Sequence, residues 1–200
     1  MELKSLFRRL ANLFNGDLKI EKVARQELQS QAPMAMLNDK GDQLAEPYQK
    51  VMCQHNAHPI CSDILKIPFN WSPPKTSTDK LYQKHSVFKS HVELLGPDGL
   101  LKSDVVRLGL YGMLPASEYG IRTHPAEEIY IMLAGDCLWK RGADIYRSLT
   151  ANERSHHPSY LPHATKTQSN AFMSVYVWIG DLSKDQYSYK GLPESSEIQN

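Results

Sequence analysis

Hydrophobic residues change their spacing about half-way along the chain. In the first hundred residues they recur every three or four positions, which predicts helices over 3–14, 20–31 and 47–53. From Val105 onward they form short β-branched and aromatic runs that are broken by Gly, Pro and Asn, which predicts strands. Residues 81–94 fit either type. The predicted strands cover 104–114, 127–134, 136–140, 145–149, 157–163 and 171–179.

Short strands at this spacing are typical of a β-sandwich or a jelly-roll barrel. We therefore expect a mainly β fold with some α: a helical region over residues 1–100 packs on a β-barrel over residues 101–190. The polar residues 191–200 are expected to form a loose tail. A chain of 200 residues with 41% hydrophobic content is long enough for one well-cored domain with a modest appendage.

Charge and cysteine content narrow the class of partner. The 23 basic and 22 acidic residues leave a net charge of +1, so no overall field favours nucleic acid or an anionic membrane, and we expect a small-molecule ligand. The three cysteines are few, and an odd number cannot all pair within the chain, so a disulfide framework is not expected. No apolar run approaches the roughly 20 residues that span a bilayer. These features favour a cytoplasmic protein, and the amphipathic helix over residues 3–14 is expected to pack on its own domain or on a twin subunit in a homodimer.

Candidate metal ligands cluster around one predicted strand. His124 and Glu128 flank the turn that leads into the strand 127–134, and His163 follows a proline some thirty residues later. Two histidines and one carboxylate can hold a divalent first-row metal and leave coordination positions open. The sequence therefore predicts a metal site inside the barrel.

Tyr130, two positions after Glu128, is a candidate to transfer a proton beside the metal. Side chains alternate faces along a strand, so Glu128, Tyr130 and Met132 point one way, whereas Ile129, Ile131 and Leu133 point the other way. Tyr130 is thus expected beside the metal ligands.

Taken together, these segments resemble the cupin superfamily, whose first motif carries HxHxxxE and then Gly, and whose second motif carries Pro and a late His. More narrowly, they resemble the dimethylsulfoniopropionate lyases of that superfamily, in which a helical N-terminal half also precedes the barrel. The motifs that carry the resemblance are His124-Pro-Ala-Glu-Glu-Ile-Tyr130, Gly135, Trp139, His157-Pro158, His163-Ala164, Thr167 and Tyr176-Val-Trp178-Ile-Gly180-Asp181.

One position departs from the cupin pattern. Arg122 stands where the first His of HxH is usual, and Arg cannot lose its proton to bind a metal. Either three side chains hold the metal together with water or substrate, or Tyr130 joins them. Arg122 can instead bind a substrate carboxylate with its planar guanidinium, and the alternative is a surface Arg beside the barrel mouth.

The resemblance implies a β-elimination that splits dimethylsulfoniopropionate into acrylate and dimethyl sulfide. It implies one divalent cation, Fe²⁺, Zn²⁺ or Mn²⁺, with Tyr130 as the base and Tyr119 as the alternative base. Trp178 and Tyr176 are candidates to hold the sulfonium by cation–π attraction, whereas Trp139 is expected in the core. His157 is expected either to line the cavity or to support a ligand from behind. Another cupin enzyme, such as a dioxygenase or an isomerase, and a non-catalytic small-molecule-binding cupin are the alternatives, and Arg122 favours the last of these.

Overall fold

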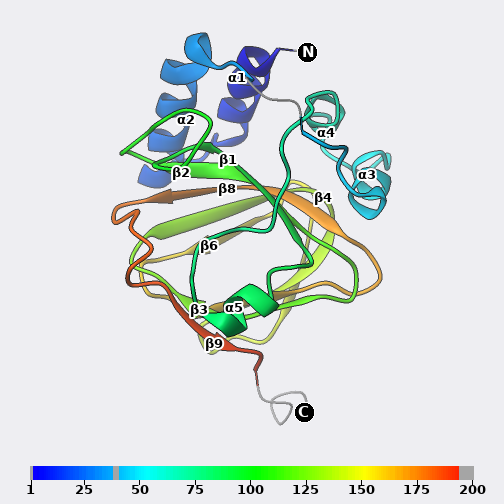
Figure 1. The fold of residues 1–200 in the computed structure, drawn as a ribbon, viewed down its shortest axis with the longest axis vertical. Coiled ribbons are helices and arrows are strands. Elements are labelled where there is room, and N and C mark those ends of the chain that lie inside the picture. The colour runs from blue at the N-terminus through cyan, green and yellow to red at the C-terminus, as the bar shows by residue number, and fades with distance from the viewer. Residues whose placement is uncertain (1, 38–40, 194–200) are drawn as a thin grey trace.

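The structure, a computed structural model, describes residues 2–37 and 41–193. Figure 1 shows a helical layer that lies on one side of a curled β-sheet, with a short helix at the opposite end. The helices are α1 (Leu3–Leu13), α2 (Lys19–Gln31), the 3₁₀ helix η1 (Ala32–Met34), α3 (Glu46–Met52), α4 (Cys61–Ile64) and α5 (Lys80–Lys84). The strands are β1 (Lys89–Leu95), β2 (Arg107–Met113), β3 (Glu118–Thr123), β4 (Glu127–Arg141), β5 (Arg147–Thr150), β6 (Arg154–His157), β7 (His163–Lys166), β8 (Phe172–Ile179) and β9 (Ser188–Gly191).

The helical layer forms because each long helix has one apolar face. In α1 the side chains of Leu6, Phe7 and Leu10 are fully buried, and in α2 Ile20 and Leu28 are fully buried. These spacings of three, four and eight residues place the apolar groups on one side of each helix. That side packs in the same core as β8 and β4, so α1 and α2 cover one face of the sheet.

The long strand β4 joins the two halves of the sheet. Its first part pairs with β8 and β6, and its last part pairs with β5 and β7. The full hydrogen-bonded order is β1-β2-β8-β4-β7-β3-β9, and all pairs within it are antiparallel. The sheet therefore curls around an interior that receives side chains from both halves.

A glycine makes the passage of β4 from one half to the other possible. Gly135 has a φ of +70°, which favours a residue without a Cβ, and a Cβ there would lie 2.0 Å from the carbonyl oxygen of Ala171. The register between β4 and β8 shifts by one residue just before it, between Met132 and Ala134. The bend and the shift together turn the second part of β4 toward β7.

The two faces of the sheet have different compositions, as the alternation in β4 predicts. Ile129, Ile131 and Leu133 pack in the core shared with the helices, whereas Tyr130 and Met132 pack in a second core inside the curl. The inner core consists largely of aromatic residues. Because Glu128 has the same parity as Tyr130, its carboxylate also points into the interior of the curled sheet.

The predicted mainly β character is confirmed, but several predicted boundaries are wrong. The separate strands 127–134 and 136–140 are one strand, because Gly135 bends the strand without ending it. Within the predicted strand 157–163, His157 ends β6, His163 begins β7, and residues 158–162 form the turn between them, which Pro158 and Pro162 favour. The ambiguous segment 81–94 contains both a helix, α5, and a strand, β1, so the sheet begins within the first hundred residues. The expected tail lies mainly outside the described residues, although Gly191 ends β9.

None of the helices in residues 2–37 and 41–193 is long and apolar enough to cross a membrane.

Candidate metal centre and cavity

The three predicted ligands meet inside the curl. His124 lies in the turn between β3 and β4, Glu128 lies at the start of β4, and His163 begins β7. Glu128 Oε2 is 3.5 Å from His124 Nε2 and 3.2 Å from His163 Nε2. One potential ligand atom from each residue lies within 4.8 Å of the other two, and all three side chains are buried.

Hydrogen bonds to the backbone orient both imidazoles. His124 Nδ1 donates to the carbonyl oxygen of Ala126 at 3.0 Å, and His163 Nδ1 donates to that of Leu161 at 2.8 Å. With the proton on Nδ1, each Nε2 has a free lone pair, which is the form that binds metals. Neither Nε2 has a hydrogen-bond partner among the described residues, although both are buried. This donor set fits one divalent cation with open positions.

The carboxylate of Glu128 is fixed by two further side chains. His157 Nδ1 donates to Oε2 at 2.8 Å, and Trp178 Nε1 donates to Oε1. Ser155 Oγ in turn donates to His157 Nε2 at 2.7 Å. Burial acts to raise the pKa of Glu128, but the imidazoles of His124, His157 and His163 around its carboxylate outweigh burial and hold the pKa well below its usual range. Glu128 is therefore an ionised carboxylate with fixed geometry.

These contacts define how His157 and Trp178 act. Both ring nitrogens of His157 are engaged, and its side chain is fully buried behind Glu128, which favours the supporting role over the cavity-lining role. The Trp178 ring stacks on the His124 ring with centroids 4.2 Å apart. Trp178 thus contacts two of the candidate metal ligands, His124 and Glu128, and also lines the cavity beside them.

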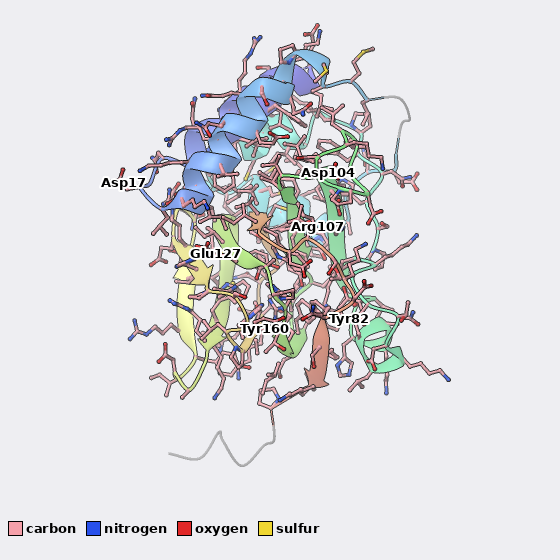
Figure 2. The ribbon with its side chains drawn as sticks, turned by 90° about the vertical axis from the view of Figure 1, so that its left-hand side faces the viewer. Asp17, Tyr82, Asp104, Arg107, Glu127 and Tyr160 are labelled. Atoms are coloured by element: carbon pink, nitrogen blue, oxygen red, sulfur yellow. The ribbon has the colours of Figure 1, made fainter. Side chains whose placement is uncertain are left out.

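The turn that carries His163 is tied to the turn that carries His124. Tyr160 donates its backbone N–H to the carbonyl oxygen of His124 at 2.8 Å. Its φ of +60° is unusual for a side chain with a Cβ and lets the chain reverse between β6 and β7. Figure 2 labels Tyr160 in the half of the molecule away from α1 and α2, so the backbone of His124, which Tyr160 contacts, also lies in that half.

Arg122 is a buried residue of the cavity wall and not a surface residue. Its side chain is 2% exposed, and its strand position pairs with His163. Nη2 donates to Thr165 Oγ1 at 3.4 Å, whereas Nη1 has no partner among the described residues. The guanidinium carbon lies 3.8 Å from the centre of the Tyr119 ring. The alternative of a surface Arg beside the barrel mouth is therefore wrong: the register of β3 shifts between Tyr119 and Arg122, and both side chains are buried.

The two candidate bases both face this cavity, in different electrostatic surroundings. Burial raises the pKa of Tyr130, and the negative charge of Glu128 and a hydrogen bond with it raise the pKa further. Burial, Tyr187 and Tyr82 likewise raise the pKa of Tyr119 well above its usual value. The positive charge of Arg122 opposes part of the rise at both tyrosines. The Tyr119 hydroxyl is hydrogen-bonded to the hydroxyl of Tyr187.

A small cavity of about 40 Å³ lies between these groups. Tyr176 and Trp178, which were expected to share a face, both line it. Tyr176 Oη is 2.8 Å from His91 Nε2, a contact that fixes the phenol. Trp139 is buried in the inner core, as expected, and contacts Tyr130 with ring centroids 4.7 Å apart.

Sequence reasoning missed several groups of this cavity. Tyr111 and Tyr187 line it, and Lys89 lies buried with its Nζ 3.1 Å from the centre of the Tyr119 ring. Alternation along β2 could have placed Tyr111 on one face, but nothing in the sequence indicated which face is the inner one. Lys89 lies in the segment whose type was ambiguous, and Tyr187 precedes the unpredicted strand β9.

Comparisons with known proteins indicate the family of this chain. The sequence profile of the family described as dimethylsulfoniopropionate lyase matches residues 42–174. The curated dimethylsulfoniopropionate lyase DddQ of Ruegeria pomeroyi is 37% identical over 89 residues, which are 44% of each protein. The match thus spans less than half the length of that curated relative.

Solved structures support the same fold over nearly the whole chain. The crystal structure of the DMSP lyase DddQ from Ruegeria pomeroyi DSS-3 gives a TM-score of 0.62 at 22% identity and covers 93% of this chain and 96% of that chain. One of the DMSP lyase structures described for RdDddP and RnDddQII gives a TM-score of 0.59 at 16% identity and covers 92% and 98%. At these identities the similarity shows the fold alone. Since the family profile covers about two thirds of the sequence, and includes His124, Glu128 and His163, the chain belongs to the dimethylsulfoniopropionate lyase family.

Proposed function

We propose that this protein is a metal-dependent carbon–sulfur lyase of the cupin type that cleaves dimethylsulfoniopropionate by β-elimination into acrylate and dimethyl sulfide. The observation that carries the proposal is the convergence of His124, Glu128 and His163 beside Tyr130 and Arg122 in a chain of this family. His124, Glu128 and His163 would hold one divalent cation, Fe²⁺, Zn²⁺ or Mn²⁺. When bound, the cation would supply a Lewis acid that polarises the substrate carboxylate.

Arg122 is suited to bind the same carboxylate. A guanidinium presents donors in a planar fork, and the free Nη1 of Arg122 faces the cavity in a buried place where an unpaired charge is costly. Binding there aligns the carbon next to the carboxylate with the tyrosines of the wall.

Tyr130 is the proposed base. As a phenolate it takes the proton from that carbon, the electrons of the C–H bond form the carbon–carbon double bond, and the C–S bond breaks with its electron pair on sulfur. Burial and Glu128 raise the pKa of Tyr130, and a cation on Glu128 acts in the opposite direction. Tyr119 is the alternative base, because its ring also lines the cavity and lies 3.8 Å from the guanidinium carbon of Arg122.

The aromatic rings of Trp178 and Tyr176 supply the wall for the sulfonium group. Aromatic faces attract such a cation by roughly 0.5–2 kcal/mol each. Both residues line the cavity together with Glu128, so the cationic end of the substrate can lie near them while its carboxylate meets Arg122.

Headspace analysis tests the proposal directly. Protein loaded with Fe²⁺, Zn²⁺ or Mn²⁺ is incubated with dimethylsulfoniopropionate, and dimethyl sulfide is measured against chelated protein and against the His163→Ala variant. Production that requires both the metal and His163 supports the lyase. No dimethyl sulfide with any of the three metals would refute it.

Arg122 in place of the usual ligand favours a second candidate, a cupin that binds a small molecule without turning it over. Calorimetry with dimethylsulfoniopropionate separates the two: binding with complete recovery of the substrate indicates the non-catalytic protein.

A further inference from the structure

Two polar groups of the cavity wall have no role in holding the metal. The hydroxyl of Tyr111 and Nη1 of Arg122 are both buried, and neither has a hydrogen-bond partner among the described residues. Both residues line the cavity that Glu128 also lines. A buried donor without a partner destabilises a protein, so two of them at one cavity indicate a missing acceptor.

The two groups come from different halves of the sheet and meet at one ring. Tyr111 lies on β2 and Arg122 lies on β3, which belongs to the other half. The Tyr119 ring stacks on the Tyr111 ring with centroids 6.3 Å apart and lies 3.8 Å from the Arg122 guanidinium carbon. The closing of the sheet therefore places a phenol and a guanidinium around the same space.

The charge around this space is also unbalanced. Lys89 is 2% exposed, its Nζ lies 3.1 Å from the centre of the Tyr119 ring, and Nζ donates a hydrogen bond to the neutral Ser86 hydroxyl at 3.2 Å. In the described ranges neither Lys89 nor Arg122 is ion-paired with a carboxylate. Burial lowers the pKa of Lys89, and the charge of Arg122 lowers it further.

We propose that Tyr111 and Arg122 form a carboxylate-binding subsite separate from the metal ligands, in which Tyr111 is the residue that sets specificity for small monocarboxylates. The Tyr111 hydroxyl donates to one carboxylate oxygen, and the Arg122 guanidinium donates to the other. The inference rests on the proposed function for the identity of the bound group, the carboxylate of the substrate or product. The binding itself does not require turnover.

A structural role and a binding role for Tyr111 predict opposite changes in stability. Removing an unpartnered buried hydroxyl leaves packing nearly intact, so Tyr111→Phe should keep or raise the melting temperature of the free protein. The same change should weaken carboxylate binding. Tyr82→Phe is the matched control, because Tyr82 also contacts the Tyr119 ring, but its hydroxyl donates to the carbonyl of Pro74 and does not line the cavity.

Calorimetric titration with propionate tests the subsite, on metal-loaded protein and on chelated protein whose fold is checked by circular dichroism. Propionate should bind both forms. Tyr111→Phe should weaken binding about 10-fold or more, Arg122→Gln should weaken it further, and Tyr82→Phe should leave it unchanged. Propionamide, which has the same shape without the charge, should bind at least 10-fold more weakly than propionate.

Several results would overturn the inference. These are equal propionate affinity in Tyr111→Phe and the parent, equal affinity for propionate and propionamide, or binding that disappears when the metal is removed from folded protein. Failure of the lyase proposal looks different, because propionate would still bind in a Tyr111-dependent way while no dimethyl sulfide forms. A lyase whose propionate binding ignores Tyr111 would retain the activity and refute the subsite.

Discussion

The two faces of β4 differ in what they do with buried side chains. On the face toward the helices, Ile129, Ile131 and Leu133 are buried among other hydrocarbon groups. On the inner face, Glu128 and Tyr130 are just as buried, but they lie among histidines, tyrosines and an arginine. Most of the buried side-chain polar atoms without a partner in the described ranges also lie on this inner side: those of Tyr111, Arg122, His124, Trp139 and His163.

The outer face of β4 is therefore expected to contribute mainly to stability, and the inner face mainly to metal binding and catalysis. The outer face gains free energy from the burial of apolar surface, at roughly 25 cal/mol per Å². The inner face forgoes part of that gain, because each unpaired buried polar group costs on the order of 1–3 kcal/mol. Changes on the outer face should therefore affect unfolding, and changes on the inner face should affect metal binding and turnover.

The largest effect is expected from the metal ligands. His163→Ala removes a buried donor whose Nε2 has no other partner, so the variant should lose stoichiometric metal and essentially all turnover. The loss should exceed the roughly 10- to 100-fold in metal affinity that is typical of residues behind the ligands. Elemental analysis beside the parent protein measures it. Full retention of metal in the variant would rule out His163 as a ligand.

Removal of the proposed base should come next. Tyr130→Phe should retain metal and melting temperature but lose about 10²- to 10⁴-fold in kcat, the usual contribution of a general base. The rate of the parent should also rise with pH as the phenolate forms. Tyr119→Phe is the matched control and should be much milder.

The reverse pattern would exchange the roles of the two tyrosines: near-parent activity in Tyr130→Phe with an inactive Tyr119→Phe. Full activity in both variants would contradict the proposed elimination.

A change on the outer face should give the opposite signature. Ile131 is 2% exposed in the core shared with the helices. Ile131→Ala should therefore lower the free energy of unfolding by about 2–5 kcal/mol, and Ile131→Val by about 0.5–1.5 kcal/mol. Urea denaturation measures both, and kcat of the folded variants should stay at the parent value. A large fall in kcat for Ile131→Val would show that the two faces are not independent.

Acid should lower the free energy of unfolding, because His91 binds a proton more weakly in the folded protein than in the unfolded chain. Burial, together with the charges of Lys184 and Arg107, lowers the pKa of His91 from 6.5 to about 3. The unfolded chain binds this proton more tightly, so the contribution of His91 to stability is present above pH 6.5 and is lost as the pH falls from 6.5 toward 3. The loss should be on the order of 2 kcal/mol. Urea titrations at pH 7 and pH 4.5 should show this fall, and His91→Gln should reduce it; an identical fall in that variant would assign it to other groups.

The smallest effect is expected from a substitution that keeps the positive charge at position 122 but alters the geometry of the hydrogen-bond donors. Arg122→Lys keeps the positive charge but replaces a planar fork by a single ammonium, so KM for the substrate should rise by roughly 10-fold. The melting temperature should remain nearly unchanged, because within residues 2–37 and 41–193 the Arg122 side chain makes a single hydrogen bond, at 3.4 Å to Thr165. Steady-state kinetics with thermal melts measure both quantities. Parent-like kinetics would show that Arg122 does not contact the substrate.

Local sequence patterns predicted some of these features better than others. Alternation along β4 was sufficient to place Glu128 and Tyr130 on one face, because a strand that contains one bulge keeps its parity over short distances. Helical spacing likewise predicted α1 and α2. The sequence could not show that Trp178 and His157 both hold Glu128, because these contacts depend on how β8 and β6 pair with β4. The contacts of Lys89 and Tyr111 with Tyr119 were missed for the same reason, since Tyr119 comes from β3 across the curl.

The central place of β4 also has a consequence for how the chain folds. Its pairing with β8 joins residues such as Glu128 and Trp178, which are 50 positions apart, and its two ends pair with different strands. Chains dominated by such distant contacts fold more slowly than helical bundles, because long loops must close before the contacts form. His124, Glu128 and His163 meet only when β3, β4 and β7 have closed. The time at which stoichiometric metal binding appears during refolding should therefore measure when β3, β4 and β7 have paired and the curled sheet is complete.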